Sequence, residues 1–240
     1  MSKEEIANLE AISEFYRNGD RMDELLVDRE VELIAKITDR PGRAVEIGCG
    51  NGYSTERLLK LFPGLKVVEP SRGNVELMKK RIGREIDCQS CLLEELDAQQ
   101  KLDQVVFLNV IEHVEDPVAS LRSIERLLSD EGQVLISAPN CMSLNRRAGY
   151  RMGLLESYAT LAPKDYALGH RRLYTVEMML EHINEAGLKC SHMKGVYLKP
   201  LSESQMVALG EPAVQAFYSL GEDVPEYCAN LFAVARKKYY

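Results

Sequence analysis

The chain of 240 residues lacks an apolar run long enough to cross a lipid bilayer. Its first residues, Met1 to Glu5, lack the pattern of a signal peptide, so we expect a cytoplasmic protein with no membrane partner. The sequence also lacks the excess of basic residues that favours nucleic-acid binding, because 37 acidic side chains outnumber 30 lysines and arginines and leave a formal charge of −7. We therefore expect no nucleic-acid partner.

A zinc-binding framework is absent as well. Cys88 and Cys91 have C-x-x-C spacing, but no second cysteine pair or histidine cluster completes a site. The pair lies in a predicted strand, where residues three apart face opposite sides. The six cysteines are scattered among apolar residues, as reduced thiols are. The sequence therefore predicts no metal.

Two common nucleotide motifs are missing, the P-loop and the G-x-G-x-x-G dinucleotide fingerprint. Instead, an apolar run with one acid, Glu46, leads to glycines at positions 48, 50 and 52, and Ser54 and Thr55 then open a helical pattern. Alternating glycines let a ligand lie against the backbone, and the helix start offers free N–H groups. This stretch predicts a nucleotide site between a strand and a helix.

Strand and helix patterns alternate after Pro41, which indicates βαβ units and a parallel sheet. We expect strands at 43–48, 65–69, 86–91, 103–109, 133–138, 188–198 and 227–234. We expect helices at 53–62, 71–82, 117–128, 175–187 and 202–220, with short ones near 143–153 and 156–162. The helical spacing of apolar residues in 4–38 predicts two further helices.

The chain divides on these patterns into an N-terminal helical cap (1–40), a cofactor-binding core (41–138), an irregular segment (139–174) that we call the lid, and C-terminal helices and strands (175–240). We expect one domain, because this length suffices for one sizeable core. The lid holds six basic and two acidic residues between 141 and 172, a local balance of +4. The lid is either a basic entrance to a binding site for an anionic ligand or a solvated basic surface.

The stretch E-I-G-C-G-N-G at 46–52 resembles motif I of class I S-adenosylmethionine-dependent methyltransferases. The run V-I-E-H-V-E-D-P at 110–117 and the element H-R-R-L-Y-T at 170–175 resemble segments of the ubiquinone and menaquinone-biosynthesis type within that family. The resemblance covers roughly residues 40 to 200. It implies a doubly wound, mostly parallel, Rossmann-like sheet of seven strands whose last strand is antiparallel, with N-terminal helices and a helical lid insertion.

The resemblance also implies the cofactor S-adenosyl-L-methionine and the product S-adenosyl-L-homocysteine. Glu69 ends the second strand, where an acid can accept both ribose hydroxyls or, alternatively, cap the next helix. Pro70 and Ser71 could flank the adenine, and Leu92 and Leu93 stand where the family often has an acid, so apolar packing on the ring is expected there. The other residues that we expect at the cofactor are Glu46, Gly48, Cys49, Gly50, Asn109 and Tyr16.

His170 is our candidate for a general base, because an imidazole suits proton transfer near neutral pH and the residue lies in the lid. A purely structural role is the alternative. His113 is a second catalytic candidate, with the same structural alternative, and Asp165 is held in reserve. Arginine forks bind phosphate or carboxylate, so we expect the acceptor to contact Arg147, Arg171, Arg172 and Tyr174.

We therefore expect methyl transfer to a hydroxyl oxygen of a small, anionic metabolite that is phosphorylated, nucleotide-linked or carboxylated. N- or C-methylation and a non-catalytic cofactor-binding partner protein are the alternatives. A nicotinamide-dependent reductase is disfavoured, because the glycine spacing differs and a Tyr-x-x-x-Lys dyad is absent. A homodimer is compatible with the sequence, which does not fix the oligomeric state.

Overall fold

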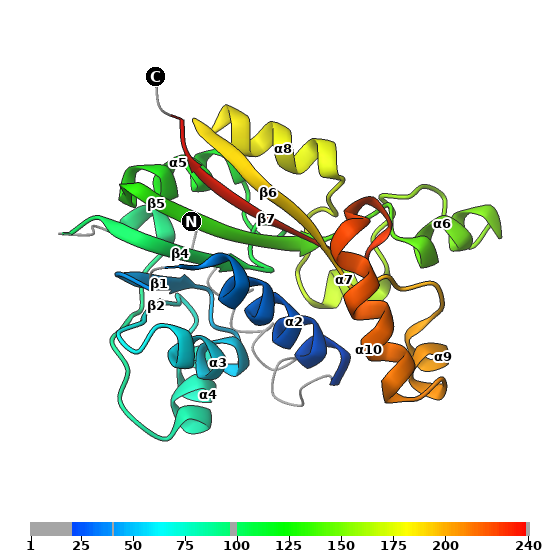
Figure 1. The fold of residues 1–240 in the computed structure, drawn as a ribbon, viewed down its shortest axis with the longest axis horizontal. Helices are drawn as coiled ribbons and strands as arrows, with labels where there is room; N and C mark the ends of the chain where they lie inside the picture. Colours follow the sequence, from blue (N-terminus) through cyan, green and yellow to red (C-terminus); the bar gives the residue numbers. More distant parts are fainter. Residues whose placement is uncertain (1–20, 40, 97–99, 239–240) are drawn as a thin grey trace.

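The structure is a computed structural model that describes residues 21–39, 41–96 and 100–238. Within these residues one sheet has seven strands in the order β3-β2-β1-β4-β5-β7-β6, in which β7 runs antiparallel to both of its neighbours (Figure 1). The strands are β1 (Ala44–Ile47), β2 (Lys66–Val68), β3 (Cys88–Gln89), β4 (Leu102–Leu108), β5 (Leu128–Pro139), β6 (Leu188–Val196) and β7 (Asn230–Lys237). The fold class predicted from the sequence is confirmed.

Helices cover both faces of this sheet. The helices are α2 (Arg21–Ile37), α3 (Tyr53–Leu61), α4 (Arg72–Ile82), α5 (Pro117–Leu127), α6 (Leu144–Arg151), α7 (Pro163–Ala167), α8 (Val176–Glu185), α9 (Glu203–Ala208) and α10 (Glu211–Leu220). Short 3-10 turns occur at Leu93–Glu95, Gly221–Asp223 and Pro225–Tyr227. In the described part of the chain, no helix combines the length and the apolar character needed to cross a membrane.

The continuous apolar run of β4 follows from its central place in the sheet. Val105 and Phe107 pack on one face, in the cluster that includes residues of α5 and α8. Val106 and Leu108 pack on the other face, in the cluster that includes residues of α2, α3 and α10. A parallel strand covered on both sides needs apolar residues at successive positions rather than at alternate ones.

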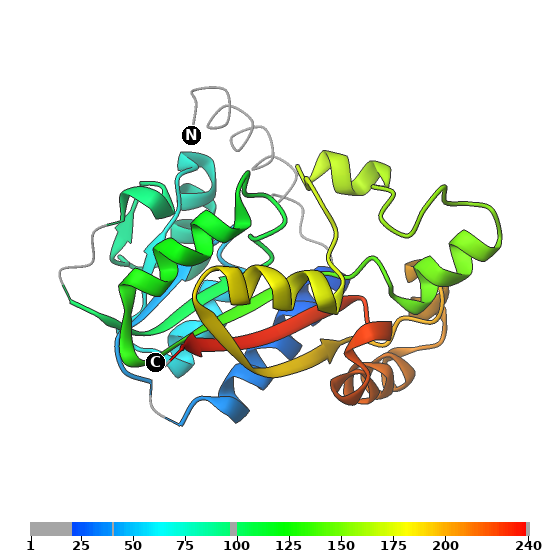
Figure 2. The same ribbon diagram turned by 90° about the horizontal axis from the view of Figure 1, so that it is seen from above.

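The carboxyl ends of the parallel strands point toward the lid. The helices α6 and α7 lie beyond these strand ends (Figure 2), and Lys164 of α7 forms an ion pair of 3.3 Å with Asp23 of α2. In an open α/β sheet, ligands bind at this edge, next to the point where the strand order reverses. Here that point lies between β1 and β4.

Several element boundaries differ from the prediction. The third strand has only two residues. The helix expected at 156–162 forms instead at 163–167. Pro163 occupies the first turn of this helix, and the Asp165 carboxylate accepts the Ala162 N–H at 2.7 Å. The helix expected at 202–220 is divided at Gly210, whose φ is +84°. The last strand begins three residues later than expected, because a 3-10 turn precedes it.

Candidate active site

The loop between β1 and α3 is built on glycines with left-handed backbone. Gly48, Gly50 and Gly52 have φ of +79°, +49° and +81°. A Cβ on Gly48 would lie 2.6 Å from Val110 Cγ2, and one on Gly52 would lie 2.7 Å from the Cα of Met78. Only glycine therefore fits at these two positions, and the loop leaves its main chain bare beside the start of a helix.

Glu46, in β1, connects the strand before the loop to the helix after it. Its side chain is buried, and its Oε1 accepts a hydrogen bond from the Ser54 hydroxyl in the first turn of α3. Its Oε2 is buried without a hydrogen-bond partner among the described residues. Burial raises the pKa of this carboxyl to about 7, although the hydroxyl of Ser54 opposes the rise. Because a buried acceptor normally has a hydrogen-bond partner, Glu46 Oε2 is available to a donor of a bound ligand or to water.

Glu69 lies at the end of β2 and faces the same loop. One carboxylate oxygen accepts the Cys49 N–H at 3.0 Å, and the other accepts the Ser71 N–H at 2.9 Å. The side chain is only 3% exposed. The carboxylate thus caps the loop and the start of α4, and ribose binding stays a prediction that requires these N–H bonds to be exchanged or shared.

The remaining residues expected at the cofactor differ in their exposure. Ser71 is fully buried and its hydroxyl accepts the Asn74 N–H at 3.2 Å as the N-cap of α4, whereas Pro70 is partly exposed. Leu93 packs into the core, and Leu92 is partly exposed beside it. Tyr16 lies outside the described residues.

Asn109 forms the tip of β4 and has a φ of +53°. Its main-chain N–H donates to the Ser137 carbonyl at 3.1 Å, and its side-chain amide donates to the Glu30 carboxylate at 3.2 Å. Asn230 in turn donates to Asn109 Oδ1 at 2.7 Å. Because these contacts occupy the side chain and the main-chain N–H, Asn109 offers its main-chain carbonyl to a ligand at the strand end.

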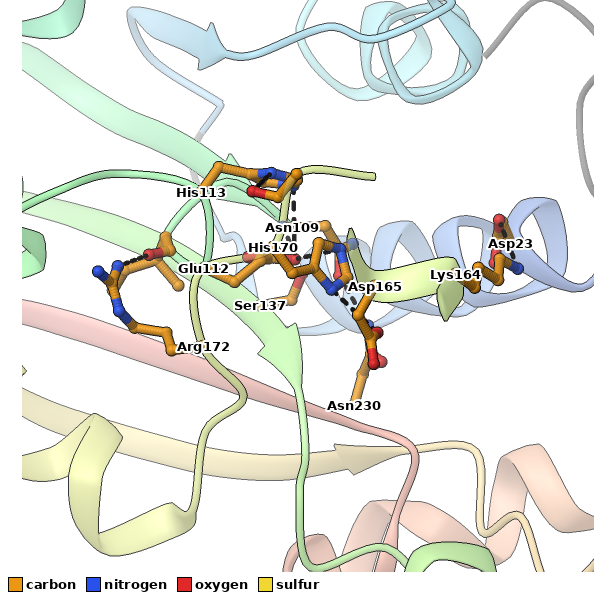
Figure 3. Close-up of polar contacts among 12 residues, drawn as sticks. Asp23, Asn109, Glu112, His113, Ser137, Lys164, Asp165, His170, Arg172 and Asn230 are labelled. Carbon is orange, nitrogen blue, oxygen red and sulfur yellow. Dashed lines mark hydrogen bonds and ion pairs between the residues drawn. The ribbon is translucent and has the colours of Figure 1, made fainter. Parts of the chain in front are cut away.

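His170 is held by an acid of its own segment (Figure 3). Its Nδ1 lies 3.2 Å from Asp165 Oδ1, and its Nε2 lies 4.0 Å from Glu112 Oε1. Burial alone would raise the pKa of Asp165, but the hydrogen bonds from His170 and from the Ala162 N–H lower it below its usual value. An ionised Asp165 fixes the Nδ1–H tautomer, which leaves Nε2 as the proton acceptor.

His113 packs edge-on against His170, with 4.9 Å between the ring centroids. Burial, followed by the charge of His170, lowers the pKa of His113 to about 4, so its imidazole is neutral near pH 7. Its Nδ1–H donates to the Gly169 carbonyl at 3.3 Å, which ties the loop after β4 to the lid. These contacts favour the structural role that the sequence left open for His113.

Glu112, His113 and His170 together could hold a metal ion. Their ligand atoms all lie within 4.8 Å of one another. Burial raises the pKa of Glu112 to about 7, and the nearby His170 imidazole opposes this rise. Its Oε2 is buried with no hydrogen-bond partner in the described part of the chain. The absence of a metal, which the sequence predicts, stays a prediction.

The arginines of the lid have unlike surroundings. Arg172 donates from Nη1 to the carbonyls of Ile111 and Val114 and from Nη2 to that of Glu115 at 3.0 Å. Arg172 therefore supports the loop after β4. The neighbouring Arg171 is exposed, and its main-chain N–H donates to the Glu112 carbonyl at 3.0 Å.

Two further residues expected at the acceptor are occupied by contacts within the chain. Arg147 donates from Nε to the Met142 carbonyl at 2.6 Å and lies over the ring of Tyr227. Tyr174 is fully buried, with its hydroxyl 3.3 Å from His182 Nδ1. The contact of each residue with the acceptor stays a prediction, and these hydrogen bonds contribute to the packing of the lid and of α8.

Sequence reasoning missed Glu30 and Glu112 as members of this site. Glu30 is a fully buried acid in α2, three and four residues before the buried Leu33 and Ile34. An acid on the apolar face of a helix was a usable signal. Glu112 stands in the quoted E-H run, but only the structure shows that its side chain faces both histidines.

A glycine loop between β1 and α3, an acid at the end of β2 and this strand order define the class I S-adenosylmethionine-dependent methyltransferase fold. Residues 19–192 match the family described as "Methyltransferase domain". The chain belongs to this family of S-adenosylmethionine-dependent methyltransferases.

Individual proteins agree with this assignment. The chain is 29% identical over 168 residues to the ubiquinone biosynthesis O-methyltransferase of Dinoroseobacter shibae, a match that covers 67% of this chain and 65% of that relative. A SAM-dependent methyltransferase of Thermotoga maritima has the same fold, with a TM-score of 0.67 at 19% identity over 95% of this chain and 98% of that one. The N-methyltransferase NodS of Bradyrhizobium japonicum, in complex with S-adenosyl-L-homocysteine, gives 0.50 at 16% identity over 82% and 79%.

The residues present fit this cofactor. The left-handed glycines 48, 50 and 52 leave the main chain of the loop without side chains, and the buried Oε2 of Glu46, in β1, has no hydrogen-bond partner among the described residues. The carboxylate of Glu69 faces the loop from β2. Gly48, Cys49, Gly50 and Glu69 would hold the cofactor, with the main chain of Asn109 at the neighbouring strand end.

Proposed function

We propose that this methyltransferase methylates a hydroxyl oxygen of a small, anionic metabolite, which is phosphorylated, nucleotide-linked or carboxylated, with His170 as the general base. The pairing of His170 with Asp165 carries the proposal. An alcohol or phenol acceptor loses a proton as its oxygen gains the methyl group, so a base within reach speeds the reaction.

The surroundings of His170 suit this task. Asp165 accepts the Nδ1 proton, so that Nε2 can take the proton of the acceptor. The His170 side chain is 10% exposed, and the Asp165 side chain is 16% exposed. A base shielded from bulk water and held by an ionised partner needs little rearrangement during the reaction.

The bound cofactor supplies an electrophilic methyl group on a sulfonium. The chain contributes alignment of the acceptor oxygen with the methyl group, which is worth about 7–11 kcal/mol when reacting atoms are held about 3 Å apart. The lid contributes by excluding water from the strand ends. His170 Nε2 receives the hydroxyl proton, and that proton leaves to water once the products separate.

The anionic class of the acceptor depends on Arg171. Its side chain is exposed, and its main chain is bound directly to Glu112 beside His170. Of the other lid cations, Arg146, Arg147 and Arg172 donate to main-chain carbonyls, Lys164 pairs with Asp23, and Arg151 is exposed. The local balance of +4 therefore overstates the charge offered to a ligand, and the proposal requires one anionic group near Arg171.

A matched panel of acceptors tests this function. The panel contains small aromatic and sugar molecules that differ only in bearing a hydroxyl or an amine, each with and without a carboxylate or phosphate. We expect release of S-adenosyl-L-homocysteine with the anionic hydroxyl compounds. Turnover only with amines would replace O- by N-methylation, and cofactor binding without turnover across the panel would favour a non-catalytic partner protein.

A further inference from the structure

Glu30 connects the N-terminal helix α2 to the ends of three strands. Its carboxylate is fully buried and accepts hydrogen bonds from the side-chain amides of Asn109 at the tip of β4, at 3.2 Å, and of Asn230 at the start of β7, at 3.4 Å. Ser137 at the end of β5 also hydrogen-bonds to this carboxylate. We call Glu30, Asn109, Ser137 and Asn230 the strand-end brace.

The other members of the strand-end brace also form hydrogen bonds directly with Asn109. Asn230 donates to Asn109 Oδ1 at 2.7 Å, while Ser137 accepts the Asn109 N–H at its carbonyl and at its hydroxyl, both at 3.1 Å. Both polar atoms of the Asn109 amide therefore have partners. A network in which each member is satisfied fixes one arrangement of its side chains.

Asn109 also has an unusual backbone. Among the described residues, only Asn109 and Tyr197 adopt positive φ without being glycine. Such a conformation has a free-energy cost and persists where the surrounding contacts enforce it, most often at functional sites. For Asn109 those contacts are the brace, and its position is the strand end at which this fold binds its ligand.

The charge around Glu30 is unfavourable to a purely stabilising role. Asp23, on the same helix, raises the pKa of Glu30. The charge of Glu30 in turn raises the pKa of Glu112, which lies after β4. β5 and β7 present only the neutral Ser137 and Asn230. Burial, the largest cause, raises the pKa of Glu30 to about 7. A buried acid near other acids destabilises a fold unless its hydrogen bonds compensate.

We propose that Glu30 is a positioning residue of the cofactor site: through its hydrogen bonds to Asn109 it holds the tip of β4 in the left-handed conformation that the bound cofactor requires. The proposal rests on cofactor binding at the ends of β1 and β4, and on neither the acceptor nor the base. It assigns part of the cofactor site to helix α2, whose Asp28 also accepts a hydrogen bond from Tyr53 directly after the glycine loop, at 3.0 Å.

Calorimetric titration with S-adenosyl-L-homocysteine tests the proposal without any acceptor. We expect Glu30→Ala to raise the dissociation constant about 10-fold, because the amide of Asn109 loses its acceptor and the strained backbone is released. Glu30→Gln, which keeps the shape and one acceptor oxygen, should recover most of the affinity. The matched control is Glu32→Gln on the same helix, whose side chain is 59% exposed.

Thermal unfolding of each variant separates misfolding from mispositioning. If Glu30→Ala is unfolded, Asn230→Ala decides, because it removes the second hydrogen bond to Asn109 and leaves Glu30 in place. A folded Glu30→Ala or Asn230→Ala with wild-type affinity would overturn the proposal. Absence of binding by the wild-type protein would instead refute the cofactor site itself, and normal binding without hydroxyl methylation would refute only the proposed function.

Discussion

His170 Nδ1 lies 3.2 Å from Asp165 Oδ1, and the opposite ring nitrogen faces the buried Glu112 at 4.0 Å. His170 belongs to the lid and Glu112 to the loop after β4, so the pair joins two segments that are far apart in the sequence. The main-chain hydrogen bond from Arg171 to the Glu112 carbonyl closes the same junction. These contacts hold the His170 side chain between the two segments.

Replacing the base should slow catalysis without weakening cofactor binding. We expect His170→Asn to lower kcat about 100-fold or more, the usual contribution of a general base. Asp165→Asn should give a smaller loss in the same direction, because the imidazole loses its orienting partner. Steady-state kinetics with the acceptor found in the panel measures both, and His192→Asn, at an exposed histidine on β6, is the control. Unchanged kcat in His170→Asn would remove the base from the mechanism.

The adjacent arginines 171 and 172 should respond in opposite ways. We expect Arg171→Ala to raise the KM of the anionic acceptor, because a charge-assisted hydrogen bond is lost, while the free energy of unfolding changes by less than about 0.5 kcal/mol. Arg172→Ala should lower the free energy of unfolding by about 2 kcal/mol, since its guanidinium donates to three main-chain carbonyls. Kinetics and urea unfolding of both variants provide the comparison. A stability loss in Arg171→Ala equal to that in Arg172→Ala would contradict the division of roles.

The buried Glu30 should make stability depend on pH. Its pKa is about 7 in the folded protein against an ordinary value of 4.5, so between these values the folded state keeps a proton that the unfolded chain releases. Its contribution therefore lowers the free energy of unfolding as the pH rises, by about 1.4 kcal/mol per pH unit. Glu30→Gln should abolish this contribution, which urea unfolding at about pH 5, 6 and 7 measures.

A neighbouring histidine opposes this trend and must be separated from it. The pKa of His113 falls from 6.5 to about 4 on folding, so between these values the unfolded chain binds the extra proton and stability rises with pH. Because His113 is present in both proteins, the difference between wild type and Glu30→Gln removes its contribution and reports Glu30 together with its coupling to Glu112. Parallel stability curves for the two proteins would show that Glu30 does not titrate as described.

The sequence predicted the sheet well, for a physical reason that β4 illustrates. Val105, Val106 and Phe107 are apolar in succession because both faces of the strand are covered. The alternating glycines likewise indicate a tight turn that a ligand can approach closely. The boundaries were less predictable. The division at Gly210 and the helix start at Pro163 depend on local turn geometry that periodicity does not encode.

The site was predicted in its parts but not in its connections. Glycine spacing identified the loop, and the two histidines were named from their motifs. The sequence placed Arg147 and Arg172 at the anionic acceptor. In the structure both also donate to main-chain carbonyls, contacts that a sequence pattern does not reveal. The meeting of Glu112 with His170 likewise depends on tertiary packing.

The glycine loop of β1 gives the most direct test of the account. Calorimetry of the wild-type protein should show heat on titration with S-adenosyl-L-methionine and with S-adenosyl-L-homocysteine. Gly48→Ala should bind at least about 10-fold more weakly, because a Cβ would lie 2.6 Å from Val110 Cγ2 and the φ of +79° is strained for alanine. Gly64→Ala, at a glycine with open space around it, should bind as wild type. No heat with either compound, and a clear signal with a nicotinamide dinucleotide, would contradict the account.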